Sequence, residues 1–376
     1  MGGGPDTKKE KLLCVLPFQE PIKILDHLRK KFPDLEISFY HLKYAEVAWK
    51  TVKEVPKEIF KDITILVTLS ALPPQQSDAP KLELIHFFSA GTNHVQNHPI
   101  YKDTDITLTT SSGIHGPQIA EWVLMTALVQ SHKYNTLYEM QKKKNWDKND
   151  TEGDYHKVRD LVGQRLGVLG YGSIGRQVAR VAKAMGNNVP YYKGETSMDV
   201  IAYTASPKDT PEKKKDAGFI VPHTGDPDGS IPSAWYSGLD KPSLHNFLSQ
   251  DIDMLLVSVP LTPQTKHFLS TAELSILGKR HAFISNIARG QIIDTPALVS
   301  ALKDGTLRGA ALDVTDPEPL PKDSELWDLP NVTITPHISG VGQAYTERAF
   351  QVLEVNLERR MNGEKLINVV RRDRGY

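Results

Sequence analysis

The chain has 376 residues, which is too many for one ordinary domain and suits two. Lys and Arg together number 45, and so do Asp and Glu, which gives a formal net charge of zero. This balance argues against a protein built around nucleic acid or an anionic membrane, because both favour an excess of basic side chains. The 39% of hydrophobic and 24% of charged residues exclude a wholly disordered chain.

Cysteine and histidine limit the chemistry further. The single cysteine, Cys14, excludes an intramolecular disulfide and a cysteine-rich zinc site, and it fits a reducing compartment. The histidines lack metal-ligand spacing, so we expect no metal. No apolar run approaches the ~20 residues of a membrane span, and the first residues lack the apolar core of a secretory signal. We therefore expect a cytoplasmic protein that binds neither membranes nor nucleic acid.

Short apolar runs alternate with helical patterns along the chain, which is typical of an α/β fold with parallel sheets. The first series predicts strands at residues 12–16, 37–40, 63–69, 84–88 and 106–109 and helices at residues 22–31 and 118–132. The second series predicts strands at residues 165–169, 254–259, 282–286, 309–313 and 332–335 and helices at residues 174–185 and 345–361.

The pattern breaks down in a long loop at residues 204–246. Six prolines and four glycines leave little room there for regular structure. We expect an ordered excursion, which Trp235, Tyr236 and Leu239 would hold against the surface of the domain.

A glycine-rich loop follows the strand at residues 165–169 and opens the next helix. It consists of Gly170, Tyr171, Gly172, Ser173, Ile174 and Gly175. In this position the first glycine permits a tight turn, the second lets the backbone approach a pyrophosphate, and the third allows close packing of helix on strand. The helix N-terminus adds free N–H groups for the phosphates. The loop therefore predicts a dinucleotide site.

The next strand of this series has two candidates. Residues 188–193 lie at the ordinary distance from the glycines, but Pro190 would cost that strand a hydrogen bond. Residues 199–204 are the better central strand, and we favour them. In that case residues 187–197 are an extra stretch, either a real surface insertion or an artefact of the gene model.

The end of this strand decides which dinucleotide binds, because an acid there holds the ribose of NAD, whereas a basic or hydroxyl group admits the phosphate of NADP. The later strand ends in Thr204, Ser206 and Lys208 without a carboxylate, which favours NADP(H). NAD(H) is the alternative if Glu195 or Asp199 reaches the ribose.

Arg289, Glu318 and His337 each follow a predicted strand of the second series. The carboxyl ends of parallel strands meet at one edge of a sheet, where open α/β sheets bind ligands. A guanidinium can grip a carboxylate with two hydrogen bonds and polarise a carbonyl. An imidazole can move a proton at the reacting oxygen, and a paired carboxylate can fix its orientation. The three residues therefore form a candidate catalytic set.

With these motifs, the sequence resembles the D-isomer specific 2-hydroxyacid dehydrogenases over most of residues 84–362. The resemblance rests on residues 88–93, 120–122, 170–175 and 259–265 and on the segments around Arg289, Glu318 and His337. It implies that Arg289 binds the substrate and polarises its carbonyl, that His337 transfers the proton, and that Glu318 modulates this transfer.

The resemblance also implies the remaining contacts and the domains. Substrate contacts would come from Ser89, Ala90 and Gly91, and further cofactor contacts from Pro260, Thr265, Ile287, Ala288, Asp313 and Gly340. A flavodoxin-like substrate domain (residues 1–117 and 338–376) would hold an inserted Rossmann domain (residues 118–337). The helix after Pro117 would belong to a homodimer interface, and the loop at residues 204–246 looks like an extension of some fungal members.

The leading hypothesis is an NAD(P)H-dependent reductase that converts a small 2-keto acid, such as glyoxylate or hydroxypyruvate, into a D-2-hydroxy acid. One alternative is a nucleotide-sensing protein similar to the transcriptional corepressors of this fold, against which the complete Arg289, Glu318 and His337 set argues. Another is an inactive relative that the extra stretch at residues 187–197 has disabled.

Overall fold

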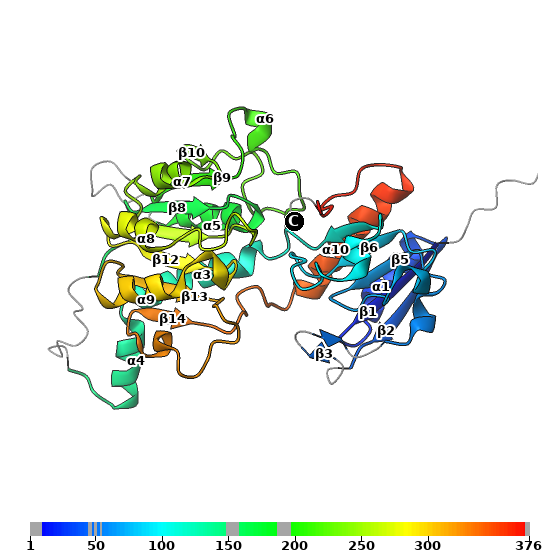
Figure 1. Cartoon of the computed structure of the whole chain (residues 1–376), viewed down its shortest axis with the longest axis horizontal. Coiled ribbons are helices and arrows are strands. Elements are labelled where there is room, and N and C mark those ends of the chain that lie inside the picture. The colour runs from blue at the N-terminus through cyan, green and yellow to red at the C-terminus, as the bar shows by residue number, and fades with distance from the viewer. Residues whose placement is uncertain are drawn as a thin grey trace, which may run out of the picture. The chain divides into compact units, whose positions relative to one another are not determined.

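The computed structural model describes residues 10–43, 47–48, 51–52, 55–147, 158–185 and 197–372. The chain divides into two compact units, which are described separately (Figure 1). Unit 1 contains residues 1–114 and 343–376, and unit 2 contains residues 115–342.

Unit 1 is built on a five-stranded parallel sheet with the order β2-β1-β5-β6-β7. Its strands are β1 (Glu10–Leu16), β2 (Leu35–His41), β5 (Ile65–Thr68), β6 (Leu84–Phe87) and β7 (Thr107–Thr110). Its helices are α1 (Ile22–Lys31), α2 (Pro99–Lys102) and α10 (Tyr345–Met361), and a small antiparallel pair is formed by β3 (Val47–Ala48) and β4 (Thr51–Val52). This strand order is that of a flavodoxin-like sheet.

Helix α10 comes from the end of the chain, yet it completes the core of unit 1. The ring of Phe350 packs edge-on against that of Phe88, just after β6, with 4.9 Å between the ring centroids. At the start of the helix, the Tyr345 hydroxyl donates a hydrogen bond of 2.6 Å to the Phe88 carbonyl. The last helix is therefore fixed to the segment that follows β6.

Unit 2 is built on a seven-stranded sheet with the order β10-β9-β8-β11-β12-β13-β14, in which every pair is parallel. Its strands are β8 (Arg165–Leu169), β9 (Asp199–Thr204), β10 (Ala234–Ser237), β11 (Met254–Val257), β12 (Phe283–Asn286), β13 (Gly309–Leu312) and β14 (Val332–Ile334). The order reverses direction at β8, as it does in a Rossmann sheet.

Helices cover both faces of this sheet, and alternate strand residues face the two layers (Figure 1). Helices α7 (Lys241–Leu248), α8 (Thr271–Gly278) and α9 (Thr295–Lys303) pack on one face with Leu255 and Val257. Helices α3 (Gly116–Ser131) and α5 (Ser173–Ala184) pack on the other face with Met254 and Leu256. The remaining helices are α4 (Tyr134–Lys142) and α6 (Pro211–Lys214).

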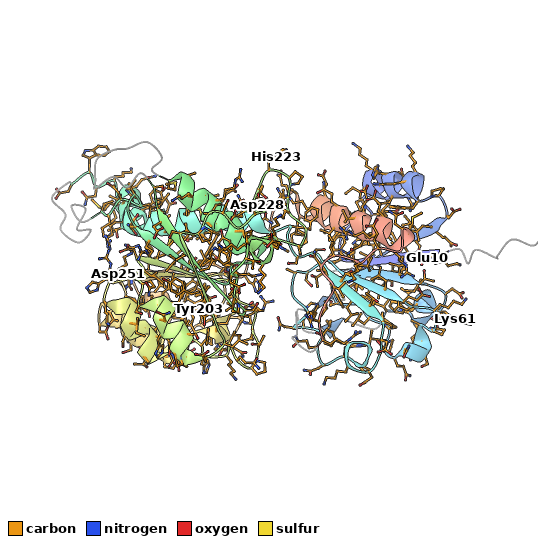
Figure 2. All side chains as sticks on the ribbon, turned by 90° about the horizontal axis from the view of Figure 1, so that it is seen from above. Glu10, Lys61, Tyr203, His223, Asp228 and Asp251 are labelled. Atoms are coloured by element: carbon orange, nitrogen blue, oxygen red, sulfur yellow. The ribbon has the colours of Figure 1, made fainter. Side chains whose placement is uncertain are left out.

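Strand β9 lies at residues 199–204, as favoured from the sequence, and its Tyr203 is buried against Phe247 of α7 (Figure 2). The competing segment at residues 188–193 lies outside the described residues, as do residues 187–196 of the extra stretch.

The prediction that residues 204–246 hold little regular structure was wrong, because β10 and most of α7 lie there. The prolines do not prevent them: Pro242 lies in the first turn of α7, where its missing N–H costs nothing, and Asp240 caps that helix. Trp235 and Tyr236 pack against the rings of Tyr171 and Phe247, as expected. Leu239 is 54% exposed and does not hold the loop.

Candidate active site

The glycine loop between β8 and α5 has the backbone geometry that a phosphate requires. Gly170 has φ of +106°, and a Cβ atom there would lie 2.7 Å from the carbonyl carbon of Ser258. A Cβ atom on Gly175 would lie 2.5 Å from the Gly170 oxygen. A Cβ atom on Gly172 would meet nothing within 4 Å. The second glycine therefore leaves open space at the N-terminus of α5, which fits a dinucleotide pyrophosphate.

Hydrogen bonds hold this loop to the neighbouring strands. The N–H groups of Gly170 and Tyr171 both donate to the carbonyl of Tyr203 at the end of β9, at 3.1 and 3.2 Å. The Ser258 hydroxyl after β11 donates to the Gly170 carbonyl at 2.8 Å. The first N–H groups of α5, from Ser173 onward, have no acceptor within the helix and are directed to its N-terminal end.

The carboxyl end of β9 carries hydroxyl and cationic groups. The Thr204 hydroxyl donates to the Ser206 carbonyl at 2.8 Å. The pKa of Lys208 is lowered, first by burial and next by the positive charge of Arg176. The first carboxylate after the strand, Asp209, pairs with Lys213 at 2.8 Å. This end of the strand is therefore a place where an anion is favourable.

Of the two acids proposed as NAD ligands, the structure describes only Asp199, which lies at the other end of β9. Asp199 begins β9, and its carboxylate pairs with Arg165 Nε at 2.7 Å at the amino end of β8. The glycine loop meets the opposite, carboxyl end of β9, so Asp199 does not reach a ribose bound there. Glu195 lies outside the described residues.

The three catalytic candidates follow β12, β13 and β14 in unit 2. Gly290 has no room for a side chain, because a Cβ atom would lie 2.0 Å from the Thr315 carbonyl carbon. This close approach brings Arg289 near the segment that carries Glu318. Burial lowers the pKa of Arg289, and the negative charge of Glu318 opposes that effect.

His337 and Glu318 are in direct contact. The Nδ1 atom of His337 lies 2.7 Å from Oε1 of Glu318, and both side chains are about two-fifths exposed. His337 has a left-handed backbone with φ of +55°. Its N–H donates to the Asp313 carbonyl at 2.9 Å. The imidazole is therefore oriented through one ring nitrogen, Nδ1, while the other, Nε2, has no hydrogen-bond partner among the described residues.

Asp313 explains how this strained segment is held. Its buried carboxylate accepts hydrogen bonds from the Thr335 hydroxyl at 2.6 Å, the Ile338 N–H at 2.9 Å, and the Ser339 N–H and hydroxyl at 3.0 and 2.5 Å. Sequence reasoning assigned Asp313 to the cofactor and missed this role. An acid at the end of β13 and two hydroxyl residues after β14 were the available signal.

The other cofactor candidates lie at the same carboxyl edge. The Thr265 hydroxyl donates to the Pro260 carbonyl at 2.7 Å and so closes the turn after β11. Ile287 and Ala288 follow β12 and are each 8% exposed. After β14, the Gly340 carbonyl accepts a hydrogen bond of 3.0 Å from Gln118. The glycine loop and the three catalytic candidates therefore all lie at the carboxyl ends of the strands in unit 2.

The expected substrate loop lies in unit 1, after β6. The Ser89 hydroxyl donates to the Gly91 carbonyl at 2.8 Å, with Ala90 between them. The Ser111 N–H donates to the carbonyls of Phe87 and Ser89, at 2.9 and 3.1 Å. These bonds give the loop a defined shape within its own unit.

Sequence reasoning also missed His86, which is fully buried behind this loop. Its Nδ1 atom lies 3.0 Å from the Thr109 hydroxyl, and its Nε2 atom lies 3.2 Å from the Ser111 hydroxyl. A lone histidine inside an apolar strand gives no signal of such a network.

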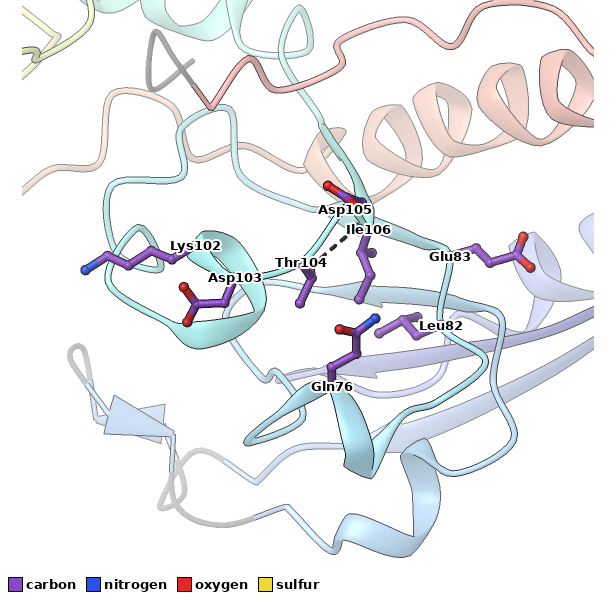
Figure 3. A pocket seen from close by; sticks show the side chains of 8 residues that line it. All are labelled: Gln76, Leu82, Glu83, Lys102, Asp103, Thr104, Asp105 and Ile106. Carbon is purple, nitrogen blue, oxygen red and sulfur yellow. Dashed lines mark hydrogen bonds between the residues drawn. The ribbon is translucent and has the colours of Figure 1, made fainter.

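Unit 1 contains a cavity of about 570 Å³, whose lining residues are shown in Figure 3 and include none of the residues just described. It is lined by Leu82, Glu83, Lys102, Asp105 and Ile106, with three others, at the amino ends of β6 and β7. Residues 89–91 follow the opposite, carboxyl end of β6, so this cavity lies apart from the expected substrate loop. Among the described residues, no helix is long and apolar enough to cross a membrane, and no group of His, Cys, Asp or Glu could hold a metal ion.

Comparison with known proteins identifies the family. The model of the D-isomer specific 2-hydroxyacid dehydrogenase NAD binding domain matches residues 124–228 and 230–339. The chain belongs to this family. Its members are NAD(P)-dependent oxidoreductases that act on the CH–OH group of their donors, and the present sheet order is that of their Rossmann domain.

The relatives include several enzymes. Glyoxylate reductase of Thermococcus gammatolerans is 26% identical over 362 residues, covering 90% of this chain and 92% of that protein. D-3-phosphoglycerate dehydrogenase of Methanocaldococcus jannaschii is 29% identical over 328 residues, which are 86% of this chain but only 55% of that longer protein.

Solved structures share the fold of the whole chain. A D-isomer specific 2-hydroxyacid dehydrogenase of Xanthobacter autotrophicus, in complex with NADPH and MES, has a TM-score of 0.70 and 25% identity, and covers 98% of this chain and 100% of its own. An NADPH-dependent glyoxylate/hydroxypyruvate reductase of Sinorhizobium meliloti has a TM-score of 0.70 and 24% identity, with the same coverage.

Proposed function

We propose that this dehydrogenase reduces a small 2-keto acid, with glyoxylate and hydroxypyruvate as first candidates, to a D-2-hydroxy acid. The observation that carries the proposal is the 2.7 Å contact between His337 and Glu318 beside Arg289, on the same sheet edge as the glycine loop. A relative named glyoxylate reductase, similar over nine-tenths of the chain, supports the choice of substrate.

The residues present suffice to prepare the substrate for reduction. A nicotinamide dinucleotide held by the glycine loop would supply the hydride for the carbonyl carbon, and so the two electrons of the reduction. Arg289 grips the carboxylate and offsets the negative charge that builds on the carbonyl oxygen. His337, oriented through Nδ1 by Glu318, gives the proton from Nε2 to that oxygen. One hydride and this proton together would convert the carbonyl group into the alcohol.

For the cofactor we propose a preference for NADP(H), with NAD(H) as the weaker ligand. The carboxyl end of β9 offers Thr204, Ser206 and Lys208, and no carboxylate stands between residues 204 and 208. A relative in complex with NADPH supports this choice. Asp216, which pairs with Arg176 at 3.5 Å, offsets part of the charge repulsion between Arg176 and Lys208, and a phosphate bound there would offset more of it.

We further propose that residues 1–117 and 338–376 bind the substrate and that residues 118–337 bind the cofactor. In this arrangement the backbone N–H groups of Ser89, Ala90 and Gly91 would receive the substrate carboxylate. The hydrogen bonds from Ser111 that shape this loop support the role.

A homodimer completes the proposal. Met125 of α3 and the stacked rings of Tyr134 and Tyr138 of α4 are about half exposed, so these two consecutive helices leave apolar surface uncovered within the described chain. A second copy would cover them. Sedimentation of the purified protein should give twice the chain mass, and Tyr138→Glu should shift it toward the monomer; a wild-type monomer contradicts this part.

The deciding experiment titrates the purified protein separately with NADPH and NADH by nicotinamide fluorescence, and then adds glyoxylate or hydroxypyruvate. Tighter NADPH binding with turnover supports the proposal. Dinucleotide binding without turnover of any 2-keto acid favours the corepressor-like alternative. Binding of neither dinucleotide refutes the enzyme and points to an inactive relative.

A further inference from the structure

Residues 205–233, here called the crossover segment, connect β9 to β10 and fold back onto the first turns of α5. The guanidinium of Arg176, only 4% exposed, donates to the Asp226 carbonyl at 2.5 Å and to the Lys214 carbonyl at 2.6 Å. The next residue of α5, Gln177, accepts a hydrogen bond of 2.6 Å from the Gly225 N–H. Side chains of α5 thus bind the backbone of the crossover segment at several points.

The segment also reaches into the glycine loop itself. The hydroxyl of Tyr171, the second residue of that loop, donates to Oδ2 of Asp226 at 2.8 Å. The Asp226 carboxylate is buried and accepts three more hydrogen bonds, from the N–H groups of Ser230 and Ile231 at 3.0 and 3.1 Å and from the Ser230 hydroxyl at 3.4 Å. Burial, together with the hydrogen bond to Asp226, raises the pKa of Tyr171 above its usual value, so the phenol stays a donor.

Two further contacts enclose the Tyr171 ring. The Trp235 ring of β10 meets it edge-on with 5.0 Å between the centroids. The guanidinium carbon of Arg176 lies 5.1 Å from its centroid. The side chain is therefore directed into the crossover segment, and the open space beside Gly172 is left to the ligand.

We propose that the crossover segment is part of the cofactor site and that Asp226 positions the glycine loop through Tyr171. The inference rests on the function proposed above. A loop with glycines on both sides of Tyr171 has many accessible conformations, and fixing one of them on binding costs free energy. The backbone bonds to Tyr203 and the side-chain bond to Asp226 fix the loop before the dinucleotide arrives.

The first test uses Tyr171→Phe, which keeps the ring contacts and removes only the hydroxyl. We expect the dissociation constant for NADPH to rise about 10- to 150-fold, the range set by one hydrogen bond to a charged group. The kcat at saturating NADPH and the KM for the keto acid should stay within about twofold, which a general loss of structure would not allow. The matched control is Tyr101→Phe in unit 1, because that buried hydroxyl has no hydrogen-bond partner among the described residues and the residue has no part in the glycine loop.

The second test uses Asp226→Asn with Asp228→Asn as its control, since Asp228 is an exposed acid in the same turn (Figure 2). Asp226→Asn should weaken NADPH binding at least as much as Tyr171→Phe, and Asp228→Asn should not change it. Coupling is reciprocal, so NADPH should slow amide hydrogen exchange at residues 226–231 of the wild type.

The outcomes separate this inference from the function on which it rests. If Asp226→Asn fails to fold, Tyr171→Phe and the exchange experiment decide. Wild-type affinity in Tyr171→Phe, or unchanged exchange at residues 226–231 on NADPH binding, overturns the role of Asp226 and leaves the proposed reductase intact. A wild type that binds neither NADPH nor NADH refutes the proposed function itself.

Discussion

Oε1 of Glu318 lies 2.7 Å from Nδ1 of His337, across two loops that follow adjacent strands. The backbone of His337 is left-handed, and the Asp313 carboxylate holds the segment that follows it. Two acids therefore act on one imidazole: Asp313 fixes the segment and Glu318 fixes the ring. In the proposed reaction, Nε2 is the ring nitrogen that would give a proton to the substrate oxygen.

This arrangement predicts that substitutions of His337 and Glu318 lower kcat to different extents. His337→Ala should lower kcat by about 10²- to 10⁴-fold, the usual contribution of a general acid. Glu318→Gln keeps the imidazole and removes the charge that orients it, so we expect a loss of about 10- to 100-fold. Steady-state kinetics with NADPH and glyoxylate measures both. Equal kcat in wild type and His337→Ala would show that another group supplies the proton.

Arg289 should act mainly on the substrate carboxylate. Arg289→Lys keeps the positive charge but loses the planar fork that binds a carboxylate with two hydrogen bonds. We expect kcat/KM for the keto acid to fall by about 100-fold, while the dissociation constant for NADPH stays unchanged. A variant that loses NADPH binding to the same extent would assign Arg289 to the cofactor instead.

Lys208 should decide between the two dinucleotides. Lys208→Ala removes a cation at the end of β9, so the dissociation constant for NADPH should rise by about tenfold and that for NADH should not change. The exposed Lys215 provides the control, because Lys215→Ala also removes one positive charge from the segment that follows β9. Fluorescence titration at one fixed ionic strength makes the comparison. An equal loss of affinity for NADPH and NADH in Lys208→Ala would show that Lys208 does not bind the phosphate that distinguishes them.

Helices and strands could be predicted from the sequence where a local pattern of residues determines them. Helices α1 and α10 lie at the predicted residues, because apolar residues recur at helical spacing and the chain has clear boundaries there. The strand at residues 199–204 was correctly preferred over one interrupted by Pro190. A local signal for α8 was also present, since Ser270 and Glu273 form a capping box.

Other features depend on tertiary contacts that no spacing reveals. Tyr171 and Asp226 are 55 residues apart, and their hydrogen bond exists only because the crossover segment folds back onto α5. Position at a strand end placed Asp313 near the site, but it could not tell whether the carboxylate faces a ligand or the next loop. His86 was not recognised because its partners come from a neighbouring strand and loop.

His86 leads to a prediction about stability and pH. Burial lowers the pKa of His86 to about 4, from an ordinary value of 6.5, and a backbone hydrogen bond at Ala349 opposes this shift only in part. Between these two values the unfolded chain binds a proton that the native state does not. The free energy of unfolding should therefore fall as the pH decreases through this window, by up to about 2 kcal/mol between pH 6.5 and pH 5 from this residue alone.

Urea unfolding at pH 7.5 and pH 5, followed through a probe in unit 1, measures this effect. His86→Gln has no titrating group and can still bond to Thr109 and Ser111, so its stability should depend less on pH than that of the wild type. The exposed His41, also in unit 1, gives the matched control, and His41→Gln should keep the wild-type dependence. An equal loss of stability in wild type and His86→Gln would mean that His86 titrates alike in the folded and unfolded chains, and the buried network behind residues 89–91 would then not keep it neutral.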